Sequence, residues 1–474
     1  MQRATIIVAA AGLSFGSSAL AAEIIVPTQM PLSVALATAA SGDTITLLPS
    51  GSPYQQFPGF QFAGKRLNIR GSTGSPADVV LDGAALDIVL RIDGAGAANS
   101  VLEHITIRNG RGATTANANG AGLVLTNGAA LRIRNCVIRD NVNPSADANG
   151  AGIYASGSPL TVEDSLIENN TMTSNIADGG GVFVTGSYNT FLRTTFRANG
   201  VASAVVPASG SIGGACYAEI GTNVFVRCRF EGNRSWDGAG LTMGNGGIAQ
   251  VDACEFVGNI GRYGAGFYIT SNGGGATIRN SVFRGNTTGA DYAAACLLRP
   301  IAMLNCTFAG NTASGNYVLG GSNSNNLDNC IVYGNTVGTA GLIPANHAIA
   351  RSNILQAAIT GGSGSRNNIV ADPKLVSGTD LHVASGSPAI DAGDGTLYSG
   401  PFVDLGGAVR VVDDPTRADT GVSILGPVID IGAFEFAPAA CPADVDNGTM
   451  GGVPDGAVTI DDLLYFLLRY EGGC

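Results

Sequence analysis

Residues 225–233 read FVRCRFEGN, residues 251–259 read VDACEFVGN and residues 278–286 read IRNSVFRGN. All three stretches end in Asn, with Phe three residues earlier (position −3), a small residue at −5 and an apolar residue at −8. Apolar or small residues recur at these positions in eight copies, which end at Asn141, Asn170, Asn199, Asn233, Asn259, Asn286, Asn311 and Asn335.

The spacing of these columns predicts two short strands joined by a bend. Side chains of a strand alternate between its faces, so positions −5 and −3 share one face. Position −8 is also apolar although it lies three residues from −5, so the alternation of faces must shift by one residue between them. Asn or Asp occupies −6, at this shift, in five copies. Both tolerate the left-handed backbone of a bend. We expect −8, −5 and −3 to be buried, −2 to be exposed, and the stacked Asn side chains to form a hydrogen-bonded ladder.

A glycine-rich motif marks a further strand in each coil. Gly150-Ala151-Gly152-Ile153 and Gly213-Gly214-Ala215-Cys216 are two examples. Coils of 24 to 34 residues between successive Asn residues, each about 4.8 Å along the axis, form a solenoid. Gly-Gly-Ala-apolar followed by Phe-x-x-Asn resembles the repeat of polymorphic membrane proteins. It also resembles the pectin-lyase-like fold, over roughly residues 100–336.

This resemblance implies an all-β fold, a right-handed parallel β-helix, to which the sequence adds a small C-terminal α-helical module with a calcium loop. The fold hosts lyases, hydrolases, epimerases and adhesins, so it does not imply one activity. The pectate-lyase and polygalacturonase signatures are absent from the sequence. Whether the protein is an enzyme is left open at this point.

The N-terminus predicts export. Arg3 precedes the apolar stretch Ile6 to Leu13, and Ala19-Leu20-Ala21 fits a signal-peptidase site. We divide the chain into a signal peptide (1–21), an N-terminal cap with the first coils (22–100), repeated coils (101–352), C-terminal coils with a closing segment (353–436), a linker (437–440) and a calcium module (441–474). Pro31 to Ala40 is expected to be a helix that covers the open end of the first coil.

Composition restricts the partners. The net charge is −11, which argues against nucleic acid, because nucleic-acid binding needs Lys and Arg to neutralise phosphates. No later segment is apolar for long enough to predict a membrane span. We expect a secreted or cell-surface monomer.

The cysteines of the −5 column stack with Ser and Thr in equivalent positions. We therefore interpret them as buried small residues. A disulfide between Cys306 and Cys330 on adjacent coils is the alternative.

The C-terminal module contains the ligand pattern of a calcium loop. Such a loop needs oxygen ligands at positions 1, 3 and 5, Gly at 6, a backbone carbonyl at 7 and an acid at 12. The matching ligands are Asp444, Asp446, Asp455, the carbonyl of Ala457 and Asp462, with an insertion of residues 447–454. Residues 460–470 are expected to form the following helix.

This module resembles half of a type I dockerin, which implies a cohesin-like partner. The single long loop departs from the two loops of that family and puts cohesin binding in doubt. Cys441 and Cys474 bracket the module, and we predict a disulfide between them. Closing a loop of that length stabilises such a unit by about 3–4 kcal/mol.

Aromatic residues recur one position after the glycine-rich motif: Tyr154, Phe183, Tyr217 and Tyr268. If these rings are exposed in file, they can stack on sugar rings. The alternative is a column covered by a loop such as residues 201–211.

The closing segment holds three acids, Asp391, Asp430 and Glu435, together with Arg410. These acids are either a catalytic cluster or partners of Arg410 that close the last coil, and we favour the second interpretation. The sequence thus predicts a secreted β-helix protein that binds a polysaccharide or a cell-surface partner and docks through its calcium module. The alternatives are a polysaccharide lyase or glycoside hydrolase, and a structural adhesin.

Overall fold

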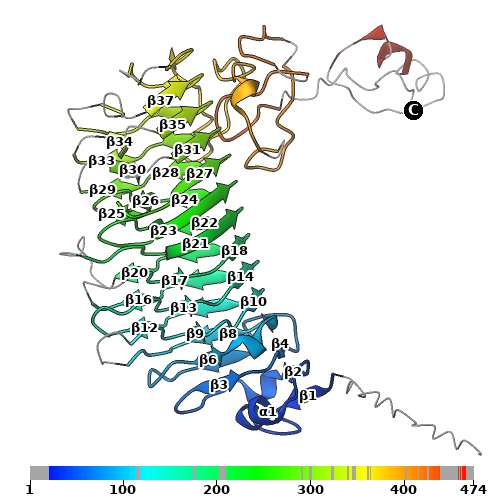
Figure 1. Cartoon of the computed structure of the whole chain (residues 1–474). Coiled ribbons are helices and arrows are strands. Elements are labelled where there is room, and N and C mark those ends of the chain that lie inside the picture. Colours follow the sequence, from blue (N-terminus) through cyan, green and yellow to red (C-terminus); the bar gives the residue numbers. More distant parts are fainter. Residues whose placement is uncertain are drawn as a thin grey trace, which may run out of the picture.

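The computed structural model describes residues 21–113, 118–174, 178–201, 210–289, 292–297, 301–315, 317–321, 325–338, 341–343, 348–359, 362, 364–400, 403–414, 416–423, 426–437, 457, 459–460 and 462–465. The described strands stack into one elongated column, which runs from the N-terminal helix to β37 (Figure 1). Successive coils pair in parallel throughout this column.

Three faces of parallel strands make up the column. Face A consists of β1 (Glu23–Val26), β2 (Thr44–Leu47), β4 (Asn68–Gly71), β7 (Ser100–Glu103), β10 (Leu131–Arg134), β14 (Leu160–Glu163), β18 (Asn189–Leu192), β27 (Gly275–Arg279), β31 (Ile301–Leu304), β35 (Asn325–Asp328) and β37 (Ala348–Arg351). Face B consists of β3 (Phe60–Ala63), β6 (Leu90–Asp93), β9 (Leu123–Thr126), β13 (Ile153–Ser156), β17 (Val182–Thr185), β26 (Phe267–Ile269), β30 (Tyr292–Leu297) and β34 (Tyr317–Gly321). The two long strands β21 (Cys216–Val226) and β23 (Leu241–Asp252) belong to both faces.

Face C lies after the bend of each coil. Its strands are β5 (Val80–Asp82), β8 (Thr106–Arg108), β11 (Val137–Arg139), β15 (Leu166–Glu168), β19 (Thr195–Arg197), β22 (Arg229–Glu231), β24 (Glu255–Val257), β28 (Val282–Arg284), β32 (Thr307–Ala309), β36 (Ile331–Tyr333), β38 (Ile354–Leu355) and β39 (Ile369–Val370). Two short ladders follow the Asn turns: β12 (Val142–Asn143), β16 (Thr171–Met172) and β20 (Gly200–Val201), then β25 (Ile260–Gly261), β29 (Thr287–Thr288) and β33 (Thr312–Ala313). The described helical elements are α1 (Leu32–Thr38) and the 3-10 turns η1 (Pro49–Gly51), η2 (Ala95–Ala97) and η3 (Gly395–Leu397), and residues 460 and 462–465 are helical as well.

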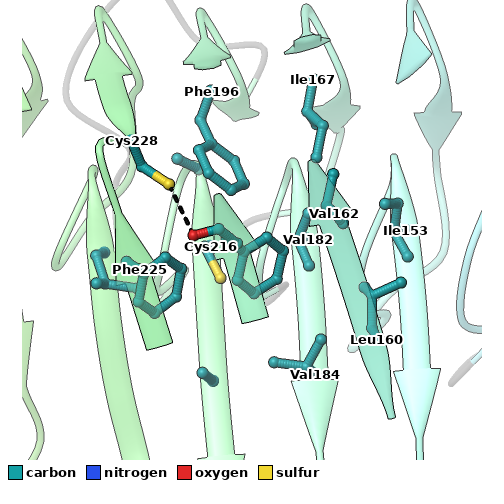
Figure 2. Packing of buried hydrophobic residues seen from close by; sticks show 14 of the residues in the cluster. Ile153, Leu160, Val162, Ile167, Val182, Val184, Phe196, Cys216, Phe225 and Cys228 are labelled. Carbon is teal, nitrogen blue, oxygen red and sulfur yellow. Dashed lines mark hydrogen bonds between the residues drawn. The ribbon is translucent and has the colours of Figure 1, made fainter. Parts of the chain in front are cut away.

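The predicted columns form the core. Every residue at −8, −5 and −3 in the eight copies is buried. At −3, neighbouring rings of Phe196, Phe230, Phe256, Phe283 and Phe308 stack face to face with centroids 4.5–4.8 Å apart. Figure 2 shows Phe196 and Phe225 among the inward side chains of facing strands. The expected internal stack is confirmed.

The bend and the Asn ladder are also present. Position −6 is left-handed in every copy, even where it is Arg193 (φ 46°), Arg227 (φ 52°) or Ala253 (φ 51°). The residue just before each ladder Asn is left-handed too, for example Gly258 (φ 61°). Each ladder Asn then donates its Nδ2 to Oδ1 of the next one at 2.8–3.2 Å, from Asn141 through to Asn335. Buried amides are thereby paired from coil to coil.

The described cysteines of the core are unpaired. Cys136, Cys216, Cys228, Cys254, Cys306 and Cys330 are buried free thiols. Cys228 Sγ donates to the carbonyl oxygen of Phe191 at 3.3 Å. Burial raises the pKa of the Cys136 thiol to about 12. The interpretation of these residues as buried small side chains is confirmed, and no Cys306–Cys330 disulfide is present.

Helix α1 covers the first coil as expected, with Leu32, Ala35 and Leu36 buried. The helix is shorter than the predicted range 31–40. Lys65 Nζ donates to the carbonyls of Ala37 (2.9 Å) and Ala39 (2.8 Å) at its C-terminal end. A cation there satisfies carbonyls that lack helical partners. No described helix has both the length and the apolar character that a membrane crossing requires.

One expectation about exposure is wrong. Position −2 on face C is exposed at Arg197, half-buried at Arg139 and Glu168, and buried at Ala309 (5% exposed). The cause at Ala309 is the closing segment, because Leu381 and Ala433 pack against Val282 and Ala309. In Figure 1 this segment, coloured orange, lies beside the upper coils of the column.

Candidate functional site

The aromatic residues lie in one register column on the outer side of face B. From the N-terminal end, the column passes through Gln61, Arg91, Val124, Tyr154, Phe183, Tyr217, Thr242 and Tyr268. The rings of Tyr154 and Phe183 stack at 5.6 Å, and those of Phe183 and Tyr217 lie 5.5 Å apart. The sequence therefore predicted the file of rings correctly.

The sequence left open whether these rings are exposed or covered, and three of them are buried. Phe183 is 4% exposed, Tyr217 5% and Tyr268 9%, whereas Tyr154 is half-buried. The tyrosine rings lie close to glycines of nearby turns and strands. A Cβ on Gly244 would lie 2.1 Å from Tyr217 Oη, and one on Gly238 would lie 2.7 Å from Tyr268 Cβ. Burial, aided by the charges of Glu219 and Asp178, raises the pKa of Tyr217.

A groove opens at the N-terminal end of the same column. Its volume is about 520 Å³, and it is lined by Leu36, Ala37, Gln61, Phe62, Ala63, Lys65, Arg91, Asp93, Val124 and Thr126. Helix α1 forms one wall, and the outward residues of β3, β6 and β9 form the floor. Val124 pairs in register with Tyr154, so the half-buried end of the aromatic stack adjoins the groove.

The charged groups that line the groove already have partners. Lys65 holds the end of α1, and Arg91 donates to Asp87 at 2.7 Å and to the Pro58 carbonyl at 3.0 Å. Asp93 is the one carboxylate of the lining, and it accepts hydrogen bonds from Thr126 Oγ1 (2.5 Å) and Asn127 Nδ2 (2.7 Å). These two hydrogen bonds lower the pKa of Asp93.

Sequence reasoning missed this groove. Gln61, Lys65 and Arg91 lie in the first coils, before the eight repeated copies, so no column drew attention to them. The available signal was the outward residue of each early strand, extended backward from Tyr154 by register.

A second hollow of about 690 Å³ lies along face C, between residues 74–76 and the bend positions Asn135, Asp164 and Arg193. Arg193 is paired with Asp164 at 2.5 and 2.8 Å, and Arg197 with Glu168. No aromatic side chain lines this hollow. This hollow therefore offers ion pairs but no aromatic ring that could stack on a sugar.

The acids of the closing segment are structural rather than accessible. Asp391, Asp430 and Glu435 are each at most 4% exposed. Arg410 Nη1 lies 3.6 Å from Glu435 Oε2, and its other nitrogens donate to Asn280 Oδ1 (2.9 Å) and to the Gly432 carbonyl (2.8 Å). Burial raises the pKa values of both Glu435 and Asp430. The charge of Asp430 raises the pKa of Glu435 further, and the charge of Asp391 raises that of Asp430. The predicted pairing with Arg410 is correct for Glu435.

The same prediction is wrong for Asp391 and Asp430, because among the described residues neither forms an ion pair with Arg410. The Asp391 side chain instead accepts a hydrogen bond from the backbone N–H of Asp414 at 3.2 Å. Its own backbone N–H donates to Asp430 Oδ1 at 2.8 Å. The three acids are too deeply covered to act on a polymer, so the catalytic alternative for them has no geometric support.

Most of the predicted calcium module lies outside the described residues, including Asp444, Asp446, Asp455, Cys441 and Cys474. Of the remaining ligands, Ala457 is exposed and Asp462 is 2% exposed. Residues 460 and 462–465 are helical, and Asp462 Oδ2 accepts the Thr459 backbone N–H at 2.7 Å. This contact is typical of a helix N-terminus.

Residues 121–298 match the family model described as "Right handed beta helix region". The described coils form a right-handed parallel β-helix. No curated protein matches the sequence. Among solved structures, the β-helix is similar to one titled "Crystal structure of pectate lyase Pel9A", with 14% identity, coverage of 86% of this chain and 91% of that chain, and a TM-score of 0.44. A likeness at that level carries no information about activity.

Proposed function

We propose that this β-helix is an extracellular protein that binds a polysaccharide, without cleaving it, in the groove between α1 and face B. The observation that carries the proposal is that Val124, which lines the groove, pairs in register with the half-buried Tyr154 on the next coil. Gln61 and Thr126 supply polar groups, and Val124 and Ala63 supply apolar surface. Sugars are bound by this combination, because an aromatic face suits the apolar face of a pyranose while polar groups meet the hydroxyls.

The partners of the charged groups favour binding over catalysis. A glycoside hydrolase needs two carboxylates across the scissile bond, and the groove lining contains Asp93 alone. A lyase needs a base that can accept a proton. Lys65 donates to two helix carbonyls and Arg91 to Asp87 and Pro58. Both cations are therefore committed to holding the walls of the groove.

The proposal is tested by binding of the full chain to a panel of soluble and insoluble polysaccharides. Ala63→Trp should fill the groove and abolish retention, and Tyr154→Ala should weaken it about three- to tenfold, the usual contribution of an aromatic contact. Ala146→Trp and Tyr188→Ala are matched controls, because both residues are exposed and lie outside the groove lining. The melting temperatures of Ala63→Trp and of both controls should stay unchanged.

Equal retention of Ala63→Trp and wild type would contradict the groove as the binding site. The same polysaccharides are incubated with the protein and assayed for unsaturated ends and for new reducing ends. Products that disappear in Ala63→Trp would replace the binding proposal with a lyase or hydrolase in the same groove.

We further propose that the C-terminal module binds calcium and docks the protein to a cohesin-like or other surface partner. Burial of Asp462 at the start of a helix agrees with its role as the last loop ligand. Ile460, Leu463 and Leu464 are exposed at 66%, 51% and 44%, and such a face suits a partner protein. Calcium should promote capture of the full chain by immobilised cohesin, and Asp455→Ala should abolish it. Capture that is equal with calcium and with chelator would contradict this role.

A further inference from the structure

We propose that Asp391, Asp413 and Asp419 form a calcium site that holds two parts of the closing segment together. One carboxylate oxygen from each of the three lies within 4.8 Å of the other two. Two oxygens that each lie 2.3–2.6 Å from one ion are separated by at most about 5 Å, so the three fit a single calcium ion. Calcium tolerates irregular coordination by carboxylate oxygens, whereas magnesium demands near-ideal octahedral geometry.

The second, independent observation is an orphaned oxygen. Asp391 is 0% exposed, and its Oδ1 has no hydrogen-bond partner among the residues that the structure describes. Leaving a buried carboxylate oxygen without a donor is costly, and a bound cation removes that cost. Within the described part of the chain, none of the three carboxylates has an ion-pair partner. The neighbouring aspartates therefore repel Asp391 with no positive charge in contact to balance them.

Backbone contacts explain why the three residues meet. The Asp391 carbonyl accepts the N–H groups of Thr420 (2.9 Å) and Gly421 (3.0 Å), which places Asp419 beside it. Asp391 Oδ2 accepts the N–H of Asp414, which places Asp413 on the other side. Asp413 and Asp419 are exposed, so an ion can enter from solvent. Calcium would thus join the turn at 387–393 to the loop at 411–423.

This site is separate from the predicted ligands of the C-terminal module and does not depend on the groove proposal. Its effect should be local, because the ion holds one loop against one turn. Hydrogen–deuterium exchange of the full chain, read on peptides covering 387–393 and 411–423, therefore tests it without interference from the other module.

Calcium at about 100 times its dissociation constant should lower local opening, and hence exchange, about 100-fold in wild type. Asp413→Asn and Asp419→Asn should abolish this response. Asp372→Asn, an exposed aspartate of the same segment outside the cluster, should keep it. Without calcium, Asp413→Asn should exchange more slowly than wild type, because the substitution removes repulsion. A merely structural aspartate would give faster exchange.

Exchange in wild type that is the same with calcium and with chelator would overturn the proposal. A full response in Asp413→Asn and Asp419→Asn, or faster exchange of calcium-free Asp413→Asn, would overturn it too. Equal protection by magnesium would overturn the assignment to calcium.

Discussion

Removal of one rung of the Asn ladder should destabilise the column far more than removal of an exposed Asn side chain. Asn259 is 0% exposed. Its Oδ1 accepts the backbone N–H of Asn233 at 3.0 Å and the Asn233 side chain at 2.9 Å. Its Nδ2 donates to Phe230 O (2.9 Å) and to Asn286 Oδ1 (3.0 Å). Asn259→Ala deletes all four hydrogen bonds at once.

The expected loss of unfolding free energy follows from the buried groups that Asn259→Ala leaves without a hydrogen-bond partner. The buried N–H of Asn233 loses its acceptor, which costs about 1–3 kcal/mol. Each of the two hydrogen bonds from Nδ2 contributes about 1 kcal/mol more. We therefore expect a loss of about 3–5 kcal/mol. Asn272→Ala is the control, because Asn272 is exposed and stands outside the ladder.

Trp236 makes the measurement local. It is the single tryptophan of the chain, it follows the rung at Asn233, and Arg262 lies 4.6 Å from the centre of its ring. Urea unfolding followed by Trp236 fluorescence reports on the coils that lose the rung. In a solenoid the effect concentrates on adjacent coils. A loss below about 1 kcal/mol, or one equal to that of Asn272→Ala, would refute the argument.

Three further outcomes follow from the core. Phe256→Ala, in the middle of the phenylalanine stack, should cost about 3–5 kcal/mol, whereas Phe57→Ala, at a residue 72% exposed, should cost little by the same denaturation assay. Folded protein at pH 8 should leave Cys136 unalkylated, because burial raises the pKa of its thiol to about 12, and peptide mass spectrometry should find it alkylated only after denaturation. Burial, with the charges of Glu219 and Asp147, raises the pKa of Asp178 to about 7. The favourable contribution of Asp178 to the unfolding free energy is therefore complete below about pH 4 and is lost as the pH rises through 7. Asp178→Asn keeps the acceptor for the Ile212 N–H and should raise the unfolding free energy above pH 7 by at most about 4 kcal/mol, with no gain at pH 4; an equal gain at both pH values would contradict the assignment.

The repeated coil could be predicted because its contacts recur. Each inward residue contacts its equivalent 24 to 34 residues away, as in the pairing of Phe230 with Phe256. The same residue types are therefore needed at the inward positions of all eight copies. A column of Phe or Asn at one spacing is therefore visible without coordinates. The left-handed bend at −6 was visible for the same reason, even though Arg193 and Ala253 do not favour that conformation.

Contacts that occur once in the fold, rather than in every coil, could not be predicted from the sequence. Arg410 reaches Asn280 across 130 residues, and Asp391 meets Asp413 and Asp419 through backbone pairing within the closing segment. No period marks such pairs, so reasoning from the sequence assigned the wrong partner to Asp391. It also could not show that Tyr217 is buried while Tyr154 lies next to a residue that lines a groove.

The sequence by itself determined the solenoid, its inward columns and its ladder, because these depend on strand periodicity and on neighbouring coils. Only the tertiary structure decided which outward columns are covered, where α1 leaves a groove and which carboxylates share a site. These features depend on non-repeating segments that fold back onto the column, and their positions are fixed by packing rather than by spacing along the chain.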